Sequence, residues 1–145
     1  MNDIRAAYLT LWLGVAGLYQ ARPEMDFSGD PIALGILTER DFERLVQLYF
    51  ASMRPFLWLL LPQLHTPEYL RSTSPFLTTA LAFAAATYDP LSAHFVARLD
   101  AHARSLATRI YYEGLKSLEI VQAYFFLSYV HLQVEALGRG AGSRR

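Results

Sequence analysis

The stretch from Pro75 to Tyr88 carries no charged side chain, and it constrains the fold of this chain more than any other segment. Ser74 and Pro75 place a hydroxyl at the capping position and a proline at the first helical residue, where its missing N–H costs nothing. The segment also has high helix propensity and little bulk, because it contains Ala80, Ala82, Ala84, Ala85 and Ala86. A helix that is apolar on all sides must be surrounded by protein. We therefore predict a central helix over residues 75–88, enclosed by the rest of the chain.

Two further start signals precede this helix. Thr66 and Pro67 repeat the cap-and-proline pattern eight residues before Ser74 and Pro75. Thr38 begins another helix, with Asp41 three residues later as the partner in a capping box. Apolar residues then recur at helical spacing until Pro55 ends the pattern: Phe42, Leu45, Val46, Tyr49, Phe50 and Met53. The sequence thus predicts two helices ahead of the central one.

The second half of the chain predicts two long helices. The first is capped by Ser92, shows an apolar stripe from Leu91 to Ile110, and ends at Gly114. Ser117 caps the last one, and Gly138 is its expected end. No segment alternates apolar and polar residues long enough to predict a strand. We expect an all-α fold with about five helices of ten or more residues, plus short turns, packed around the central apolar helix 75–88.

The remaining segments are less regular. Residues 4–20 have the length of a helix, although two glycines weaken it, and residues 22–31 have the composition of a linker. The apolar run 56–61 fits either a buried helical turn or an extended segment, which periodicity cannot distinguish. Residues 139–145 are too small and polar to pack and are expected to be disordered. The predicted division is residues 1–29 (apolar helix and linker), 30–137 (helical domain) and 138–145 (basic tail).

Composition limits the classes of function. The chain has 145 residues and equal numbers of basic and acidic side chains, so no overall charge attracts it to nucleic acid or to an anionic membrane. Hydrophobic residues make up 53% of the chain, which is more apolar surface than one small domain easily hides. Uncovered apolar helix faces favour association, so we expect self-association or low solubility.

The charge-free runs bear on membranes and secretion. The longest are about 15 residues, short of the roughly 20 needed to cross a bilayer, so no membrane span is expected. Tyr8 to Tyr19 has the length of a signal-peptide core, but Asp3 offsets Arg5 and no small-x-small cleavage site precedes Arg22. An amphipathic helix docked on the core, or an incidental leader, fits these flanks better than a signal peptide.

The residue types that carry chemistry are sparse. With no cysteine, the chain has no disulfide, no thiolate metal site and no cysteine nucleophile. The histidines, His65, His94, His102 and His131, form no metal-ligand pattern and fit a loop and helix surfaces. Glu113 and Glu119 are close in sequence and are expected to be solvated. We therefore predict no catalytic residues, no metal site, no cofactor and no enzymatic activity.

Aromatic residues on the central and last helices define the one candidate ligand pocket. Alanines opposite aromatic rings can leave a cavity, although they can equally permit close helix approach. The candidate lining residues are Phe76, Phe83, Phe125 and Tyr129. For the C-terminal aromatic residues, helical spacing favours core packing over a platform for stacking nucleic-acid bases.

Several short segments, in order and spacing, are similar to a known family. They are Asp30-Pro31, Gly35-Ile36-Leu37, the capped helix from Thr38, Pro55-Phe56, Leu64 to Tyr69, Ser74-Pro75-Phe76-Leu77 and Glu119 to Ala123. Together they resemble the fungal-specific transcription factor domain, the middle homology region of binuclear zinc-cluster regulators. The resemblance covers Asp30 to about Leu132.

The resemblance implies a helical regulatory region that, in such regulators, accompanies a six-cysteine zinc cluster that reads DNA. This chain has no cysteine, so no DNA-binding residue of the family can be assigned to it. We expect a regulatory fragment acting in the nucleus through protein contacts or effector sensing, with partners in the transcription machinery or self-association. We expect no sequence-specific DNA binding by the chain itself. The alternative is a stand-alone helical module that binds a small molecule or a protein.

Overall fold

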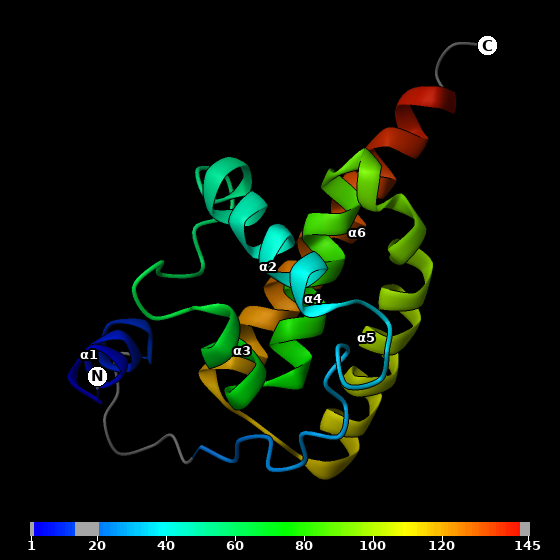
Figure 1. The fold of residues 1–145 in the computed structure, drawn as a ribbon. Coiled ribbons are helices and arrows are strands. Elements are labelled where there is room, and N and C mark those ends of the chain that lie inside the picture. The colour runs from blue at the N-terminus through cyan, green and yellow to red at the C-terminus, as the bar shows by residue number, and fades with distance from the viewer. Residues whose placement is uncertain (1, 14–20, 143–145) are drawn as a thin grey trace.

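The computed structural model describes residues 2–13 and 21–142 and shows an all-α fold, as predicted (Figure 1). The described part contains six α-helices, two short turns of other helical types and no strand. Five of these helices have ten or more residues, the number expected. The elements are α1 (Asn2–Leu13), α2 (Glu39–Leu48), the π-helical turn η1 (Tyr49–Met53), α3 (Pro67–Thr73), α4 (Pro75–Tyr88), the 3-10 turn η2 (Pro90–Ser92), α5 (Ala93–Glu113) and α6 (Leu118–Gly142).

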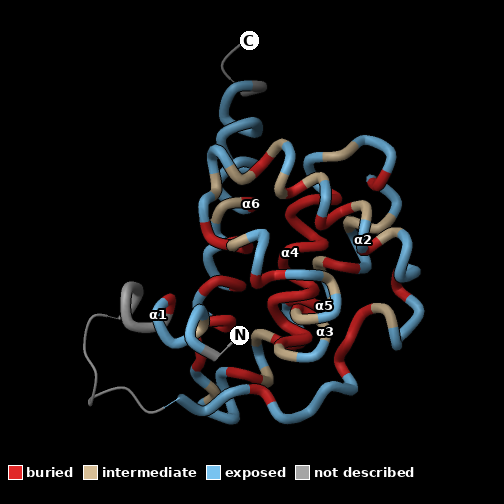
Figure 2. Tube along the Cα trace, turned by 60° about the vertical axis from the view of Figure 1, so that its left-hand side comes forward, coloured by how far each residue is buried: buried red, intermediate tan, exposed pale blue. Residues whose placement is uncertain are grey.

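The central helix lies where the sequence predicts it. Every residue of α4 from Pro75 to Ala86 is buried, and α5 and α6 pack along it while α2 and α3 cover other sides (Figure 2). The Ser74 hydroxyl accepts a hydrogen bond from the N–H of Leu77 at 3.0 Å, which is the predicted cap. The hydroxyls of Thr78 and Thr79 donate to backbone carbonyls four residues earlier, so these buried polar groups are satisfied inside the helix.

The other predicted helix starts are largely confirmed. Thr38 and Asp41 form a complete capping box on α2, and Thr66 caps α3 through the N–H of Tyr69. Ser117 caps α6 through the N–H of Ile120. The prediction for α5 is wrong in detail, because the Ser92 side chain makes no cap hydrogen bond to the helix. Its hydroxyl instead donates to Asp89 and accepts from Arg44.

Gly114 ends α5 as expected. Its φ of 65° lies in the left-handed region, where a Cβ is strained, and its N–H is bonded to the last turn of the helix. Gly138, in contrast, does not end α6, which continues to Gly142. The expectation of disorder is therefore wrong for residues 139–142, and residues 143–145 lie outside the described part. Arg139 pairs with Glu135 one turn earlier, at 3.4 Å, which favours the helix.

The apolar run 56–61 adopts the extended alternative. Leu59 and Leu60 are buried in the core, whereas Phe56 and Trp58 are 78% and 73% exposed. The buried Tyr49 hydroxyl fixes this segment, because it accepts hydrogen bonds from the N–H groups of Leu59 (3.2 Å) and Leu60 (3.3 Å). The same hydroxyl donates to the carbonyl of Leu57. A single core side chain thus satisfies the backbone of a segment that has no regular structure of its own.

Within the first 29 residues, the structure describes residues 2–13 and 21–29. A helix is present over Asn2–Leu13, which starts two residues before the predicted range 4–20, and residues 14–20 of that prediction lie outside the described part. The predicted linker 22–31 packs on the domain. Arg22 exchanges two backbone hydrogen bonds with Lys116, at 2.7 and 2.8 Å, and Glu24 and Asp30 are buried. None of the helices in the described part is long and apolar enough to cross a membrane.

Candidate functional site

One exposed apolar surface of the domain lies on α6. This helix carries no charged side chain between Glu119 and Glu135, so it is apolar on two sides. One side faces α4 and is buried through Ile120, Ala123, Phe126 and Val130. The opposite side, which we call the α6 outer face, carries Val121, Phe125 and Leu132, and Tyr124 lies at its edge with its ring against Phe76 of α4.

These side chains are substantially open to solvent. Their exposed fractions are 38% for Val121, 40% for Tyr124, 48% for Phe125 and 66% for Leu132. The end of α6 also extends beyond the other helices (Figure 1), and Leu137 on this end is 74% exposed. Contiguous apolar surface of this kind, on a helix long enough to lie against another chain, is typical of protein contact sites.

A groove borders the buried side of α6. It has a volume of about 410 Å³ and lies between the ends of α4, α5 and α6. Phe83, Val96, Val130 and Val134 supply its apolar walls, and the Asp100–Arg104 ion pair, at 2.9 Å, lies at its rim. A second hollow of about 570 Å³ between α2 and α3 is lined in part by Phe50 and by two glutamates. Both volumes fall in the range of small-molecule sites.

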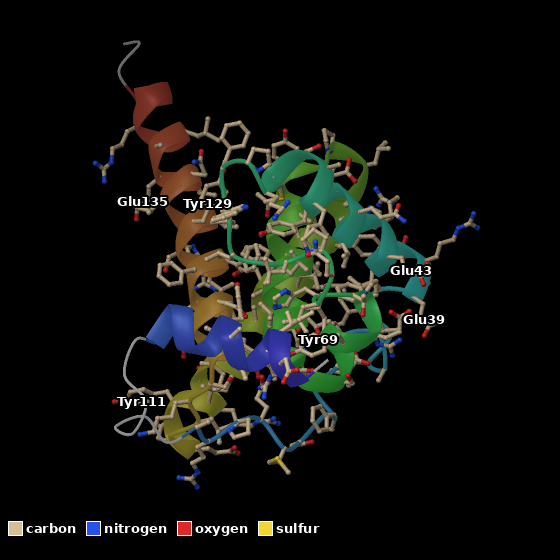
Figure 3. The ribbon with its side chains drawn as sticks, turned by 90° about the vertical axis from the view of Figure 1, so that its left-hand side faces the viewer. Glu39, Glu43, Tyr69, Tyr111, Tyr129 and Glu135 are labelled. Atoms are coloured by element: carbon tan, nitrogen blue, oxygen red, sulfur yellow. The ribbon has the colours of Figure 1, made fainter. Side chains whose placement is uncertain are left out.

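The four residues of the predicted pocket occupy different surroundings. Phe76 is fully buried, and its ring meets that of Tyr124 edge-on at 5.1 Å between centroids. Phe83 lines the groove just described. Phe125 belongs to the α6 outer face, and Tyr129, labelled in Figure 3, is half-buried against the core. A single pocket that joins all four stays a prediction.

A buried carboxylate caps the central helix. Glu24 is only 3% exposed; its Oε1 accepts from the N–H of Phe76 at 3.1 Å, and its Oε2 accepts from the Ser74 hydroxyl. Burial raises the pKa of Glu24. Because Glu24 satisfies one N–H group at the start of α4 and also binds the capping hydroxyl of Ser74, the segment that appeared to be a linker stabilises the central helix.

A second buried carboxylate begins α6. Glu119 is only 4% exposed, so the expectation of a solvated side chain is wrong. Arg5 of α1 covers it: its Nη2 lies 3.0 Å from Glu119 Oε1, and its Nε donates to the Tyr69 hydroxyl at 3.2 Å. Sequence reasoning missed this pair because its members are 114 residues apart.

Three more polar side chains, those of Tyr8, His65 and Gln122, meet where α1 contacts the domain. The Tyr8 hydroxyl donates to the carbonyl of Leu59 and accepts from the amide of Gln122, which also donates to that carbonyl at 3.0 Å. His65 Nδ1 accepts from the N–H of Leu61 at 2.8 Å, and burial lowers the pKa of His65 to about 4. The ring of His65 meets those of Tyr8 and Tyr69 edge-on.

These buried polar groups are engaged in contacts that hold the fold. Glu24 and Glu119 sit at helix starts, and His65 is held by backbone N–H, so each is engaged in a structural hydrogen bond. Within residues 2–13 and 21–142, no group of three or more acidic, histidine or cysteine side chains is placed to hold a metal ion. The features open to a partner are the α6 outer face and the two grooves.

Comparison with known proteins gives one short similarity. Protein priB of Lentinula edodes is 44% identical to this chain over 55 residues, which are 38% of this chain and 10% of that protein. The chain therefore matches about a tenth of the length of this curated relative. No protein-family model matches the chain, and no solved structure matches it.

Proposed function

We propose that this chain is a regulatory region of a fungal zinc-cluster transcription factor, that it acts in the nucleus, and that it works through protein contacts and not through catalysis. The observation that carries the proposal is the α6 outer face, a helix side without charge on which Val121 and Leu132 are 38% and 66% exposed. Exposed apolar side chains on a helix side without charge favour contact with a partner protein.

The resemblance to the fungal regulatory domain supports the same proposal. Three of its segments coincide with structural start points: Thr66-Pro67 at α3, Ser74-Pro75 at α4 and Glu119 to Ala123 in the first turns of α6. The similarity to Protein priB, from a fungus, is consistent with a fungal origin for this segment. Within such a regulator, the helical region would hold a partner, or restrain an attached DNA-binding module until a partner or effector shifts its packing.

A reporter assay tests this function. The full chain is fused to an unrelated DNA-binding domain in a fungal host, and transcription from a promoter with the matching site is compared with that given by the DNA-binding domain alone. We expect a change of at least threefold. Replacing Phe125 and Leu132 together by serine should remove most of it, while Tyr111→Ser, at an 81% exposed position on α5, should not.

Two outcomes contradict the proposal: a fusion that leaves transcription unchanged, and equal effects of the α6 and α5 substitutions. A gel-shift assay with the unfused chain provides a separate test. We expect no tight, sequence-specific DNA binding, because the chain has no cysteine with which to build the zinc cluster.

The second candidate function is a small-molecule-binding module. The groove of about 410 Å³ beside Phe83 favours it, because apolar walls with a charged rim fit an apolar metabolite that carries a polar group. A ligand present at one hundred times its Kd would stabilise the fold by about 2.7 kcal/mol. A thermal-shift screen of apolar metabolites in which no compound raises the Tm would exclude this candidate.

A further inference from the structure

The polar groups that α1 contacts are also held by residues outside α1. Leu59 is held by the Tyr49 hydroxyl, His65 by the backbone of Leu61, and Gln122 by the Leu59 carbonyl. These contacts lie within the part of the chain that follows residue 21. The hydrophobic core likewise runs from Ile36 to Val130 and includes no described residue of α1. The surface is therefore preorganised by the domain.

The contacts of α1 with this surface come from one face of the helix. Over residues 3–8, whose side chains the structure describes, Tyr8 is buried and Arg5 is partly covered, while Asp3, Ile4, Ala6 and Ala7 are exposed. Arg5 and Tyr8 are three residues apart, so they lie on the same side of the helix. Figure 3 shows α1 lying across the start of α6, with Tyr69 nearby.

The acceptors on this surface fit a guanidinium group. Arg5 contacts two different acceptors, Tyr69 and Glu119, through two of its nitrogens. The planar fork of arginine can do this, whereas a lysine ammonium presents one point of charge. Without Arg5, Glu119 would be a buried carboxylate that has lost its cation, because the Nη2 of Arg5 lies 3.0 Å from Glu119 Oε1.

The phenol site beside it is equally specific. A hydroxyl placed as in Tyr8 both donates to the Leu59 carbonyl and accepts from Gln122, which a phenylalanine cannot do. The Oε1 atom of Gln122 is buried and has no hydrogen-bond partner among the described residues. The site thus keeps one acceptor that no described side chain of α1 uses, and a ligand with a further donor can take it.

We propose that the surface formed by Leu59, His65, Tyr69, Glu119 and Gln122 is a binding site for a helix that carries an arginine and, three residues later, a tyrosine. α1 is its built-in occupant, and a partner helix of the same pattern displaces it. In this proposal the site is occupied by α1 of the same chain until a helix of a partner protein replaces it. This site is separate from the α6 outer face, and its tests do not depend on any role in transcription.

The first test uses a synthetic peptide of residues 2–13, acetylated and amidated, with Trp12 replaced by phenylalanine. It is titrated into the full chain carrying Trp58→Phe, a change at an exposed position that leaves Trp12 of α1 as the single tryptophan. We expect a saturable change in Trp12 emission as the peptide displaces α1. The same peptide with Arg5→Lys, or with Tyr8→Phe, should bind at least tenfold more weakly.

The second test removes the built-in competitor. A full chain with Arg5→Ala and Tyr8→Ala is titrated against a fluorescently labelled peptide of residues 2–13, and binding is followed by anisotropy. It should bind at least tenfold more tightly than the unmodified chain, because a tethered occupant competes at an effective concentration on the order of millimolar. Adding Glu119→Gln should weaken binding at least tenfold, whereas Glu113→Gln, at a solvent-exposed carboxylate near the end of α5, should not.

The tryptophan experiment does not depend on the chain with Arg5→Ala and Tyr8→Ala. If circular dichroism shows that the Arg5→Ala, Tyr8→Ala chain has lost its helices, the tryptophan experiment alone decides. No saturable signal at millimolar peptide in that experiment overturns the proposal. An equal response to the Arg5→Lys and Tyr8→Phe peptides, or an equal effect of Glu119→Gln and Glu113→Gln, also overturns it, because binding would then not depend on the groups that define the site.

Discussion

Ser74 and Thr66 occupy the same position in two consecutive helices but differ in their surroundings, and replacing each by alanine tests how the central helix is held. Thr66 is exposed and makes one cap hydrogen bond, from the N–H of Tyr69 at 3.2 Å. Ser74 is only 1% exposed; it accepts from the N–H of Leu77 and donates to the carboxylate of Glu24.

The two substitutions should therefore differ in cost. Loss of a cap alone costs about 1 kcal/mol, which is the value expected for Thr66→Ala. Ser74→Ala loses the same cap and, in addition, a hydrogen bond to a buried charged group worth about 2 kcal/mol, so we expect about 3 kcal/mol in total. For a chain of this length the corresponding falls in Tm are about 4 °C and about 12 °C.

Urea titrations followed by circular dichroism measure both values, and Glu24→Gln completes the comparison. In the Glu24→Gln chain, Ser74→Ala should cost about 1 kcal/mol, because the buried charge has already been removed. The reasoning is refuted if Ser74→Ala destabilises the protein no more than Thr66→Ala does. It is also refuted if the cost of Ser74→Ala is the same with and without the charge of Glu24.

Other substitutions test separate parts of the account. The pKa of His65 is about 4 in the fold against 6.5 for an ordinary histidine, so the unfolded chain binds a proton first as the pH falls. The stability that His65 contributes is thus complete above pH 6.5 and falls by about 3 kcal/mol towards pH 4. Urea titrations from pH 7.5 to 4.5 should show this fall in the free energy of unfolding for the unmodified chain, and a smaller fall for His65→Gln. Gly114→Ala should destabilise the protein by about 1 kcal/mol, since the φ of Gly114 is 65°. Gly138→Ala should raise the stability of α6 by up to about 1 kcal/mol, because the added methyl meets nothing within 4 Å. A Tm that rises in Gly114→Ala, or one that falls in Gly138→Ala, would contradict the assignment of that glycine. The chain should self-associate in light scattering, and Phe125→Ser with Leu132→Ser should lower the average mass, whereas a monomer at high concentration in the unmodified chain would contradict this.

The features that sequence predicted correctly are local ones. The caps at Thr38, Thr66, Ser74 and Ser117 each depend on residues within three positions, and the end of α5 at Gly114 depends on one backbone conformation. Such signals can be recognised along the chain because the interacting groups are neighbours in it. The burial of α4 followed in the same way from its lack of charge.

The features that sequence missed depend on distant pairs. Glu24 meets Ser74 across 50 positions, and Arg5 meets Glu119 across 114, so neither contact leaves a periodic or capping pattern. Each carboxylate alone was indistinguishable from a solvated side chain. The prediction that α6 ends at Gly138 was wrong for another reason. Glycine lowers helix stability by only about 1 kcal/mol, which neighbouring turns and the Glu135–Arg139 pair can offset.

The candidate sites show the same difference between local signals and contacts of distant residues. The charge-free pattern of α6 indicated an apolar helix, but not that Val121, Phe125 and Leu132 would be left open on one side. The site beneath α1 could not be inferred at all, because it combines an extended segment, α3 and α6. Tertiary packing determines both features.

Amide hydrogen exchange across the whole chain tests the central claim most directly, namely that α4 is a charge-free helix enclosed by its neighbours. The account predicts that the amides of residues 79–86 exchange more slowly than those of every other helix, and only through global unfolding. They should be slowed by orders of magnitude relative to the amides of α1 and of the projecting end of α6. Exchange in α4 as fast as in α1 would show that the helix is open to water and would contradict the account.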